Sequence, residues 1–282
     1  MISESALWFG VQLALAAAMI LLGSVVARQR PALWKSVAVA AAGAALIWPL
    51  MRWHPDLFLH VLGARVLMHI EVIGLIPAVL LLFTIAARHA DCFKQRRLSV
   101  WLVLVCVMYF IRNGLWMIYP PVPDLGQTQY RNGVCMQSTS YTCVAASLVT
   151  LLNAYEVPTT ETEMARLSRT EEGNGTTDTR AVNALEQKLA GRGVEVRYET
   201  MDYDRLQEVD KPCLVATAYG YFVSHMVPVL SADKDAVVLG DPLTGRRTLS
   251  VAEFRKIWRA RGIYLHAPAG TAGRLMRDSS IQ

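Results

Sequence analysis

Long runs of apolar residues occupy the first 119 positions of the chain, and the remainder mixes apolar and polar residues over shorter distances. A helix needs about 20 mostly apolar residues to cross a bilayer. Four stretches reach or approach this length, at residues 6–27, 36–51, 66–87 and 98–119. The second is the shortest, and it spans a bilayer if Lys35 and Arg52 extend their charged ends to the interfaces. The pattern predicts an N-terminal all-α transmembrane bundle of four helices.

The basic residues between these stretches predict an orientation. Lys and Arg concentrate in the cytoplasmic loops of membrane proteins. The first loop carries three of them and the third carries four, whereas the N-terminal tail carries none. The apolar stretch Leu57–Ala64 is too short to cross and is interpreted as interfacial. We therefore expect an integral protein of a bacterial inner or plasma membrane, with everything after Tyr119 outside the cytoplasm.

A stiff connector separates this membrane region, residues 1–119, from a second domain. The Pro-rich stretch "YPPVPDLG" predicts a linker over residues 120–130. We expect the domain itself at residues 131–268 and a polar tail at 269–282.

Periodicity in the second domain predicts helices first and strands afterwards. Helical spacing marks Cys143–Glu156, Thr160 and Glu163 form a capping box for a second helix, and Asp178 caps a third. Strands are expected at residues 194–199, 213–219, 225–232, 236–240 and 262–266, with a turn at "DPLTG" and a short helix at 251–258. This order indicates an α+β fold.

The amino-acid composition limits the classes of function that the chain can have. Hydrophobic residues make up 53% of the chain and charged residues only 18%, which fits a membrane protein. The net charge of +5 needs no nucleic acid to explain it, because much of the basic excess lies in the short loops. The sequence has no zinc-type Cys pairs and no Gly-rich phosphate loop, so we expect no metal, no other cofactor and no ATP.

Four residues of the second domain have the types and positions of a thiol active site. Cys143 opens a predicted helix, where the helix dipole favours a thiolate. His225 starts one predicted strand and Asp241 ends the next, so a hairpin would bring them to the same end of the sheet as a base and its orienting group. The Gln137 amide and the Cys143 backbone N–H are candidate donors to an oxyanion.

This order of residues resembles the bacteriocin-processing cysteine peptidases, papain-like domains that cut double-glycine leader peptides and often precede ABC transporters. The resemblance covers about residues 137–264, through the motifs "QSTSYTC", "HMVPVL", "DPLTG" and "VAEFRKIW". It implies a papain-like α+β fold, with Cys143 as nucleophile, His225 as base, Asp241 as orienting group and Gln137 as oxyanion donor. A polypeptide substrate follows, with membrane lipid and an export or assembly machinery as further expected partners.

The sequence departs from that family in two ways. Thr142 and Val144 flank the cysteine where the family usually has Asp and Gly. The chain also has no nucleotide-binding domain, and its expected orientation puts the domain outside the cytoplasm, where the transporter-borne peptidases do not work. The resemblance therefore predicts the reaction class more closely than the substrate, which is a double-glycine leader or another secreted or membrane-delivered polypeptide.

The sequence leaves alternatives open for the activity of the second domain, for two cysteines, for one loop and for the membrane half. The domain could hold a peptide without cutting it, or transfer the acyl group to an amine instead of water. Cys135 and Cys213 form a disulfide in an oxidising compartment, or Cys213 is a plain strand residue. Tyr219, Gly220 and Tyr221 line a substrate groove or belong to an ordinary loop. The membrane half is an anchor, a partner-binding bundle or part of an export system.

Overall fold

The computed structural model describes residues 4–74, 76–114, 124–219 and 224–266. The chain divides into two compact units, Met1–Pro120 and Pro121–Gln282.

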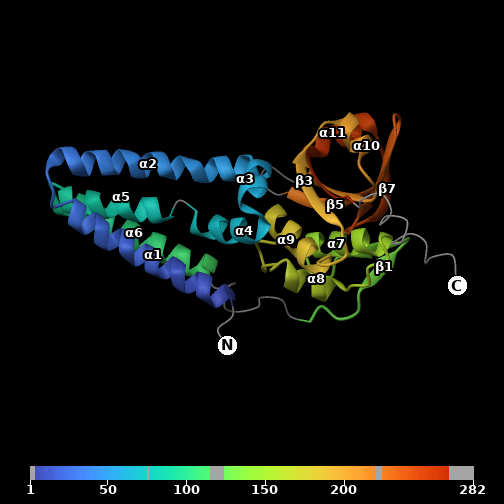
Figure 1. Ribbon diagram of the computed structural model, residues 1–282, viewed down its shortest axis with the longest axis horizontal. Coiled ribbons are helices and arrows are strands. Elements are labelled where there is room, and N and C mark those ends of the chain that lie inside the picture. The colour runs from blue at the N-terminus through green and yellow to red at the C-terminus, as the bar shows by residue number, and fades with distance from the viewer. Residues whose placement is uncertain (1–3, 75, 115–123, 220–223, 267–282) are drawn as a thin grey trace. The chain divides into compact units, whose positions relative to one another are not determined.

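The N-terminal unit consists of helices in its described part (Figure 1). They are α1 (Glu4–Val26), α2 (Pro31–Trp53), α3 (Pro55–Leu62), α4 (Ala64–Ile73), α5 (Ile76–His89) and α6 (Phe93–Gly114). Three segments of the described residues are long and apolar enough to cross a membrane: Leu7–Val26, Pro31–Met51 and Ala64–His89. The prediction of an apolar helical region is confirmed.

Details of the predicted spans change in the structure. The second helix begins earlier than predicted, because Pro31 occupies its first turn, where proline is well tolerated. The predicted span 98–119 corresponds to α6 as far as Gly114, and its last five positions lie outside the described residues. Over its described residues α6 is not among the three segments that could cross a membrane, so the predicted number of four spans is not reached there. The short apolar stretch that was expected to lie at an interface forms the separate helix α3.

The predicted third span is interrupted at Gly74. This glycine has a φ of +49°, which ends α4, and a Cβ there would lie 2.5 Å from the indole nitrogen of Trp48. The same indole donates a hydrogen bond to the Glu71 carbonyl at 3.3 Å, in the last turn of α4. A packed tryptophan thus occupies the space beside the break, which a hydrophobic run in the sequence does not reveal.

Apolar side chains hold the helices of this unit together. One cluster joins α1, α5 and α6 through Ala16, Leu80 and Phe110. A second joins α1, α2 and α5 through residues that include Val26 and Ala41.

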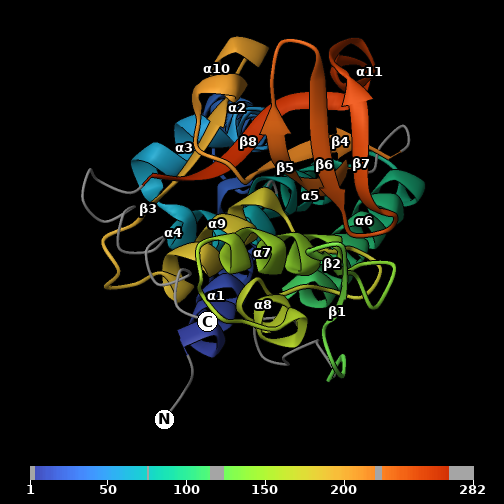
Figure 2. The same cartoon turned by 90° about the vertical axis from the view of Figure 1, so that its right-hand side faces the viewer.

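The C-terminal unit contains an antiparallel six-stranded sheet in the order β3-β8-β4-β5-β6-β7. Its strands are β3 (Glu195–Thr200), β4 (Cys213–Ala218), β5 (Ser224–Ala232), β6 (Ala236–Asp241), β7 (Gly245–Ser250) and β8 (Trp258–His266). A small hairpin pairs β1 (Gln129–Arg131) with β2 (Val134–Met136). The helices are α7 (Cys143–Ala154), α8 (Glu161–Leu167), α9 (Asp178–Lys188), α10 (Tyr203–Glu208) and α11 (Val251–Ile257). Helices α7–α9 gather on one side of the sheet and α10 and α11 on the other (Figure 2).

This arrangement confirms the predicted α+β class, with corrections. The sequence reasoning missed β1, β2, α10 and β7. The strand β7 lies at the sheet edge with mostly exposed polar residues, so it carries no alternating pattern. Thr177, and not Asp178, caps α9, because its hydroxyl accepts the Arg180 N–H. Thr160 caps α8 as predicted, by accepting the Glu163 N–H, but the predicted capping box is incomplete because the Glu163 carboxylate binds Thr159 and Lys188.

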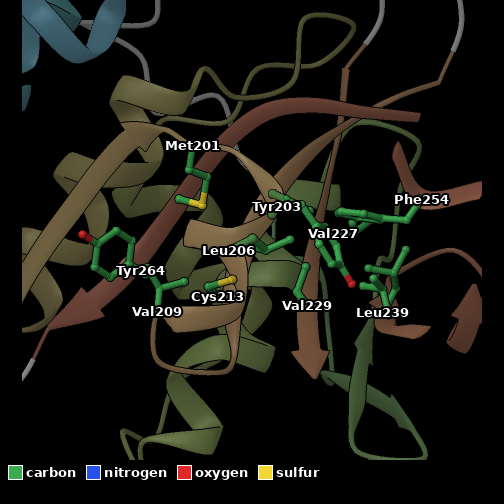
Figure 3. Close-up of a cluster of buried hydrophobic side chains, with 12 residues drawn as sticks. Met201, Tyr203, Leu206, Val209, Cys213, Val227, Val229, Leu239, Phe254 and Tyr264 are labelled. Carbon is green, nitrogen blue, oxygen red and sulfur yellow. The ribbon is translucent and has the colours of Figure 1, made fainter. Parts of the chain in front are cut away.

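A hydrophobic core lies between the sheet and the helices α10 and α11 (Figure 3). Its members come from distant parts of the chain, such as Leu206 of α10, Val229 of β5 and Phe254 of α11. Val229 and Leu239 place the β5–β6 hairpin, which carries two of the predicted site residues, against this core.

Candidate active site

The β5–β6 hairpin brings His225 and Asp241 together. The strands run antiparallel and pair Val229 with Leu239, so the start of β5 and the end of β6 lie at the same end of the sheet. His225 Nε2 and Asp241 Oδ1 are 3.0 Å apart, and both side chains are buried. The predicted proximity of these two residues agrees with the structure.

Hydrogen bonds keep the Asp241 carboxyl ionised. Burial raises the pKa of this carboxyl, but hydrogen bonds from His225 and from the Leu243 N–H outweigh it, and the pKa falls from 3.8 to about 2. Arg247 Nη1 adds a longer contact of 3.4 Å to the second carboxylate oxygen. Asp241 is therefore an anion across the physiological range.

The same pair stabilises a protonated His225. Burial lowers the pKa of this imidazole, but its interactions with Asp241 and with Cys143 outweigh burial and raise the pKa from 6.5 to about 9. Because Nε2 faces Asp241, Nδ1 is the ring nitrogen left for Cys143. The structure thus brings Cys143, His225 and Asp241 into one electrostatic group.

Cys143 is the first residue of α7 and is half-buried. A helix N-terminus presents N–H groups without intrahelical partners and favours negative charge. Thr142, the N-cap residue, makes no side-chain cap to this helix. Its buried hydroxyl instead accepts the Thr139 N–H at 3.1 Å, within the loop that precedes the cysteine. The Thr142 side chain therefore does not cap the end of α7 at which the Cys143 N–H lies.

A buried serine ties the cysteine helix to the histidine strand. Ser147 Oγ donates a hydrogen bond of 2.8 Å to the carbonyl of Met226. Ser147 lies one turn after Cys143, and Met226 follows His225 directly. The bond therefore sets the position of α7 against β5 close to both side chains.

Gln137 lies in the loop before Cys143 and contacts the turn after Asp241. Its backbone N–H donates to the Pro242 carbonyl at 3.0 Å. Its side-chain Nε2 donates to the Thr139 carbonyl at 2.6 Å, while Oε1 is buried with no hydrogen-bond partner. A primary amide has two N–H donors, so one remains after the bond to Thr139.

An exposed tyrosine stands beside the histidine. The rings of Tyr219 and His225 have centroids 5.5 Å apart at an interplanar angle of 44°. The Tyr219 side chain is 64% exposed. The ring therefore offers exposed apolar surface directly beside His225.

Sequence reasoning missed the polar residues that support the site. Ser147 and Glu161 are buried and bind groups far away in the sequence, so no local spacing marks them. The sequence showed Glu161 only as part of the start of α8. Burial of a polar residue is the signal that identifies both, and it requires the fold.

The two other cysteines of this unit are buried free thiols. Burial raises the pKa of Cys213 to about 12, and burial together with the charge of Glu161 raises that of Cys135 to about 12. Cys213 belongs to the core between the sheet and α10. Within the described ranges, no group of three or more His, Cys, Asp or Glu side chains could hold a metal ion.

Comparison with known proteins places these observations in a family. The model of the peptidase C39 family matches residues 131–269. An uncharacterised protein of Methanothermobacter thermautotrophicus is 32% identical over 135 residues, which cover 48% of this chain and 89% of that protein. The probable functional amyloid protease FapD of Pseudomonas fluorescens is 29% identical over 146 residues, 50% of this chain and 63% of that protein.

Solved structures similar to this chain include peptidase domains of transporters. A double glycine motif protease from an AMS/PCAT transporter, in complex with the leader peptide, has 19% identity and a TM-score of 0.42, covering 51% of this chain and 96% of that one. The peptidase domain of Streptococcus ComA has 22% identity and a TM-score of 0.42, with 47% and 96% coverage.

The fold and the site define a two-part protein, an apolar helical region followed by an α+β domain of the peptidase type. Through this second domain, the chain belongs to the peptidase C39 family.

Proposed function

We propose that the protein is a membrane-anchored cysteine endopeptidase, and that Cys143, His225 and Asp241 form its catalytic triad. The observation that carries the proposal is the buried His225–Asp241 pair at 3.0 Å, whose histidine also interacts with a cysteine at a helix N-terminus. Membership of the C39 family supports the same reaction class.

The proposed reaction starts from a Cys143 thiolate beside the His225 imidazolium. The Cys143 thiolate attacks the scissile carbonyl carbon, and the carbonyl oxygen takes the electron pair as an oxyanion. The free N–H of the Gln137 amide and the Cys143 backbone N–H donate to that oxyanion. His225, protonated at neutral pH, gives its Nδ1 proton to the leaving amine. Water then attacks the thioester with His225 as general base, which releases the acid product and regenerates Cys143.

The substrate that we propose is a segment of an exported polypeptide. Two comparisons support this class: one similar solved structure holds a leader peptide, and FapD is named a probable functional amyloid protease. The three apolar segments suit a protein that meets its substrate at a membrane. With α6 as the fourth span, the distribution of Lys and Arg supports a bacterial inner or plasma membrane, with the peptidase domain outside the cytoplasm.

The first experiment needs no known substrate. The full-length protein in detergent is treated with iodoacetamide at a series of pH values, and mass spectrometry gives the rate at each cysteine. Cys92, which is exposed outside the peptidase unit, serves as the internal reference thiol. We expect Cys143 to react faster than Cys92 at pH 6, and we expect His225→Ala to abolish the difference.

The opposite result would overturn the proposal. A Cys143 rate that rises only through about pH 8.5, as for an ordinary thiol, and that is the same in His225→Ala, would show that no activated thiolate exists. The domain would then act as a peptide-binding module that does not cleave.

A further inference from the structure

The carboxylate of Glu161 is almost completely buried beside the loop that carries Gln137. The residue is 1% exposed and lies in the first turn of α8. Among the described residues no Lys or Arg forms an ion pair with it. Burying an unpaired carboxylate is unfavourable unless hydrogen bonds satisfy it, so its partners identify what it does.

Both oxygens of this carboxylate bind a single residue, Ser138. The Ser138 backbone N–H donates to Oε1 at 2.8 Å, and the Ser138 hydroxyl donates to Oε2. The Glu161 N–H is itself held by Thr128 Oγ1 at 3.1 Å. The carboxylate therefore clamps one residue of the loop through two charge-assisted hydrogen bonds, which are stronger than neutral ones.

The clamped residue is the one between Gln137 and Thr139. Gln137 is fixed at its backbone by the Pro242 carbonyl and at its side chain by the Thr139 carbonyl. Thr139 in turn bonds to Thr142, the residue before the cysteine. Ser138 is thus the point at which a second element, α8, holds this loop.

We propose that Glu161 is a positioning residue, which holds Ser138 so that the Gln137 amide is presented to the oxyanion. This inference rests on the proposed function, since it assigns Glu161 a role through Gln137. An oxyanion donor stabilises the transition state most when it is already in place before the reaction. A donor that must first reorganise loses part of this stabilisation.

A peptide aldehyde tests this role without a known substrate. With acetyl-glycyl-glycinal, the Cys143 sulfur bonds to the aldehyde carbon, the C=O π bond opens, and the oxygen takes the electron pair and then a proton from His225. The resulting hemithioacetal places its oxygen where the oxyanion forms. Its dissociation constant is measured on the full-length protein from the protection of Cys143 against iodoacetamide.

A double-mutant cycle separates positioning from general stability. We expect Gln137→Ala to weaken aldehyde binding by at least about 10-fold, as loss of an oxyanion donor does. We expect Glu161→Gln to weaken it by about 5-fold or more on its own, but by less than about 2-fold in the Gln137→Ala background, because residues that act through one another are not additive. The inference would be overturned if the fold-changes of the two single variants multiply fully in the double variant, or if Glu161→Gln alone leaves aldehyde binding unchanged.

Two further variants guard against misfolding. Ser138→Ala removes only the hydroxyl bond and is expected to act in the same direction as Glu161→Gln, with a smaller effect. Glu163→Gln is the matched control, because Glu163 lies on the same helix but pairs with Lys188 at 2.6 Å; aldehyde binding should not change. If Glu163→Gln weakens binding as much as Glu161→Gln, the effect belongs to α8 as a whole and the inference fails.

The two proposals fail in different ways. If the wild-type protein shows no fast alkylation of Cys143 at pH 6, the proposed function fails. If that alkylation is fast and His225-dependent while the cycle is fully multiplicative, only the role of Glu161 fails.

Discussion

Ser147 and Met226 join the two halves of the candidate active site through one buried hydrogen bond, in which the serine hydroxyl donates to the carbonyl at 2.8 Å. The serine belongs to the helix that begins at Cys143, and the carbonyl follows His225 on its strand. The distance between cysteine and histidine therefore depends on a bond that neither of them makes.

We expect Ser147→Ala to lower both stability and thiol reactivity. The change leaves the buried Met226 carbonyl without its donor, which typically costs about 1–3 kcal/mol of unfolding free energy. It also loosens α7 against β5, so the alkylation of Cys143 at pH 6 should slow. Urea denaturation and the alkylation rate measure the two effects.

Ser168→Ala is the control for this change. Ser168 is also buried and donates to the Met164 carbonyl at 2.7 Å, but within α8 and its end. It should lower the unfolding free energy while the alkylation rate at pH 6 stays unchanged. Equal slowing in both variants would contradict a specific role for Ser147.

The pH dependence of the domain follows from the His225–Asp241 pair. The pKa of His225 is raised from 6.5 to about 9, so its contribution to stability is full below about pH 6.5 and is lost as the pH rises through about 9. The pKa of Asp241 is lowered from 3.8 to about 2, so its contribution is present above pH 3.8 and is lost as the pH falls toward 2. The pair should stabilise the domain most between about pH 4 and 6.5, as measured by urea denaturation across pH.

Removing the charge of Asp241 should lower the pKa of His225. In Asp241→Asn the imidazolium loses its anionic partner, so we expect fast alkylation of Cys143 to move to higher pH. Arg247→Ala is the control, because the Arg247 side chain is 46% exposed and its contact with Asp241 is 3.4 Å. Because Arg247 is exposed to solvent and its contact is long, we expect it to contribute less than about 1 kcal/mol, and the alkylation profile should not move. The assignment of Asp241 as the orienting group is wrong if both variants behave alike.

Tyr219 should contribute to binding without activating the thiol. The exposed ring beside His225 offers apolar surface to a peptide, so Tyr219→Ala should weaken acetyl-glycyl-glycinal binding several-fold, while Tyr219→Phe retains it. The assay is the aldehyde protection of Cys143. Unchanged binding in Tyr219→Ala would assign the ring to an ordinary loop.

Gly245 controls the turn that follows Asp241. Its φ is +87°, and a Cβ would lie 3.1 Å from Arg131 Cδ, so Gly245→Ala should destabilise the domain by about 1–2 kcal/mol or more. Urea denaturation measures this cost. Gly191→Ala is the matched comparison, since Gly191 has a φ of +78° but open space around a Cβ. The two φ values are alike and the exposed Arg131 side chain can move, so both variants should be destabilised by similar amounts; no loss of stability in either would contradict the strain argument.

The sequence by itself determined most helices and the central strands of the peptidase domain, but not β1, β2, α10 or β7, and it determined that His225 and Asp241 lie close together. Helical and alternating patterns report burial along one segment, and a short loop between two strands leaves only an antiparallel hairpin, so the start of β5 and the end of β6 coincide. The position of Cys143 at the start of α7 is equally local, because the apolar periodicity begins there.

Only the tertiary structure decided which groups hold these residues in place. The bonds of Glu161 to Ser138, of Ser147 to Met226 and of Gln137 to Pro242 join residues far apart in the chain. The packing of Trp48 from another helix against Gly74 is likewise a contact between distant residues. Such contacts form only when the elements pack against one another. The pattern of residues within one segment does not indicate which side chain of another element will contact it.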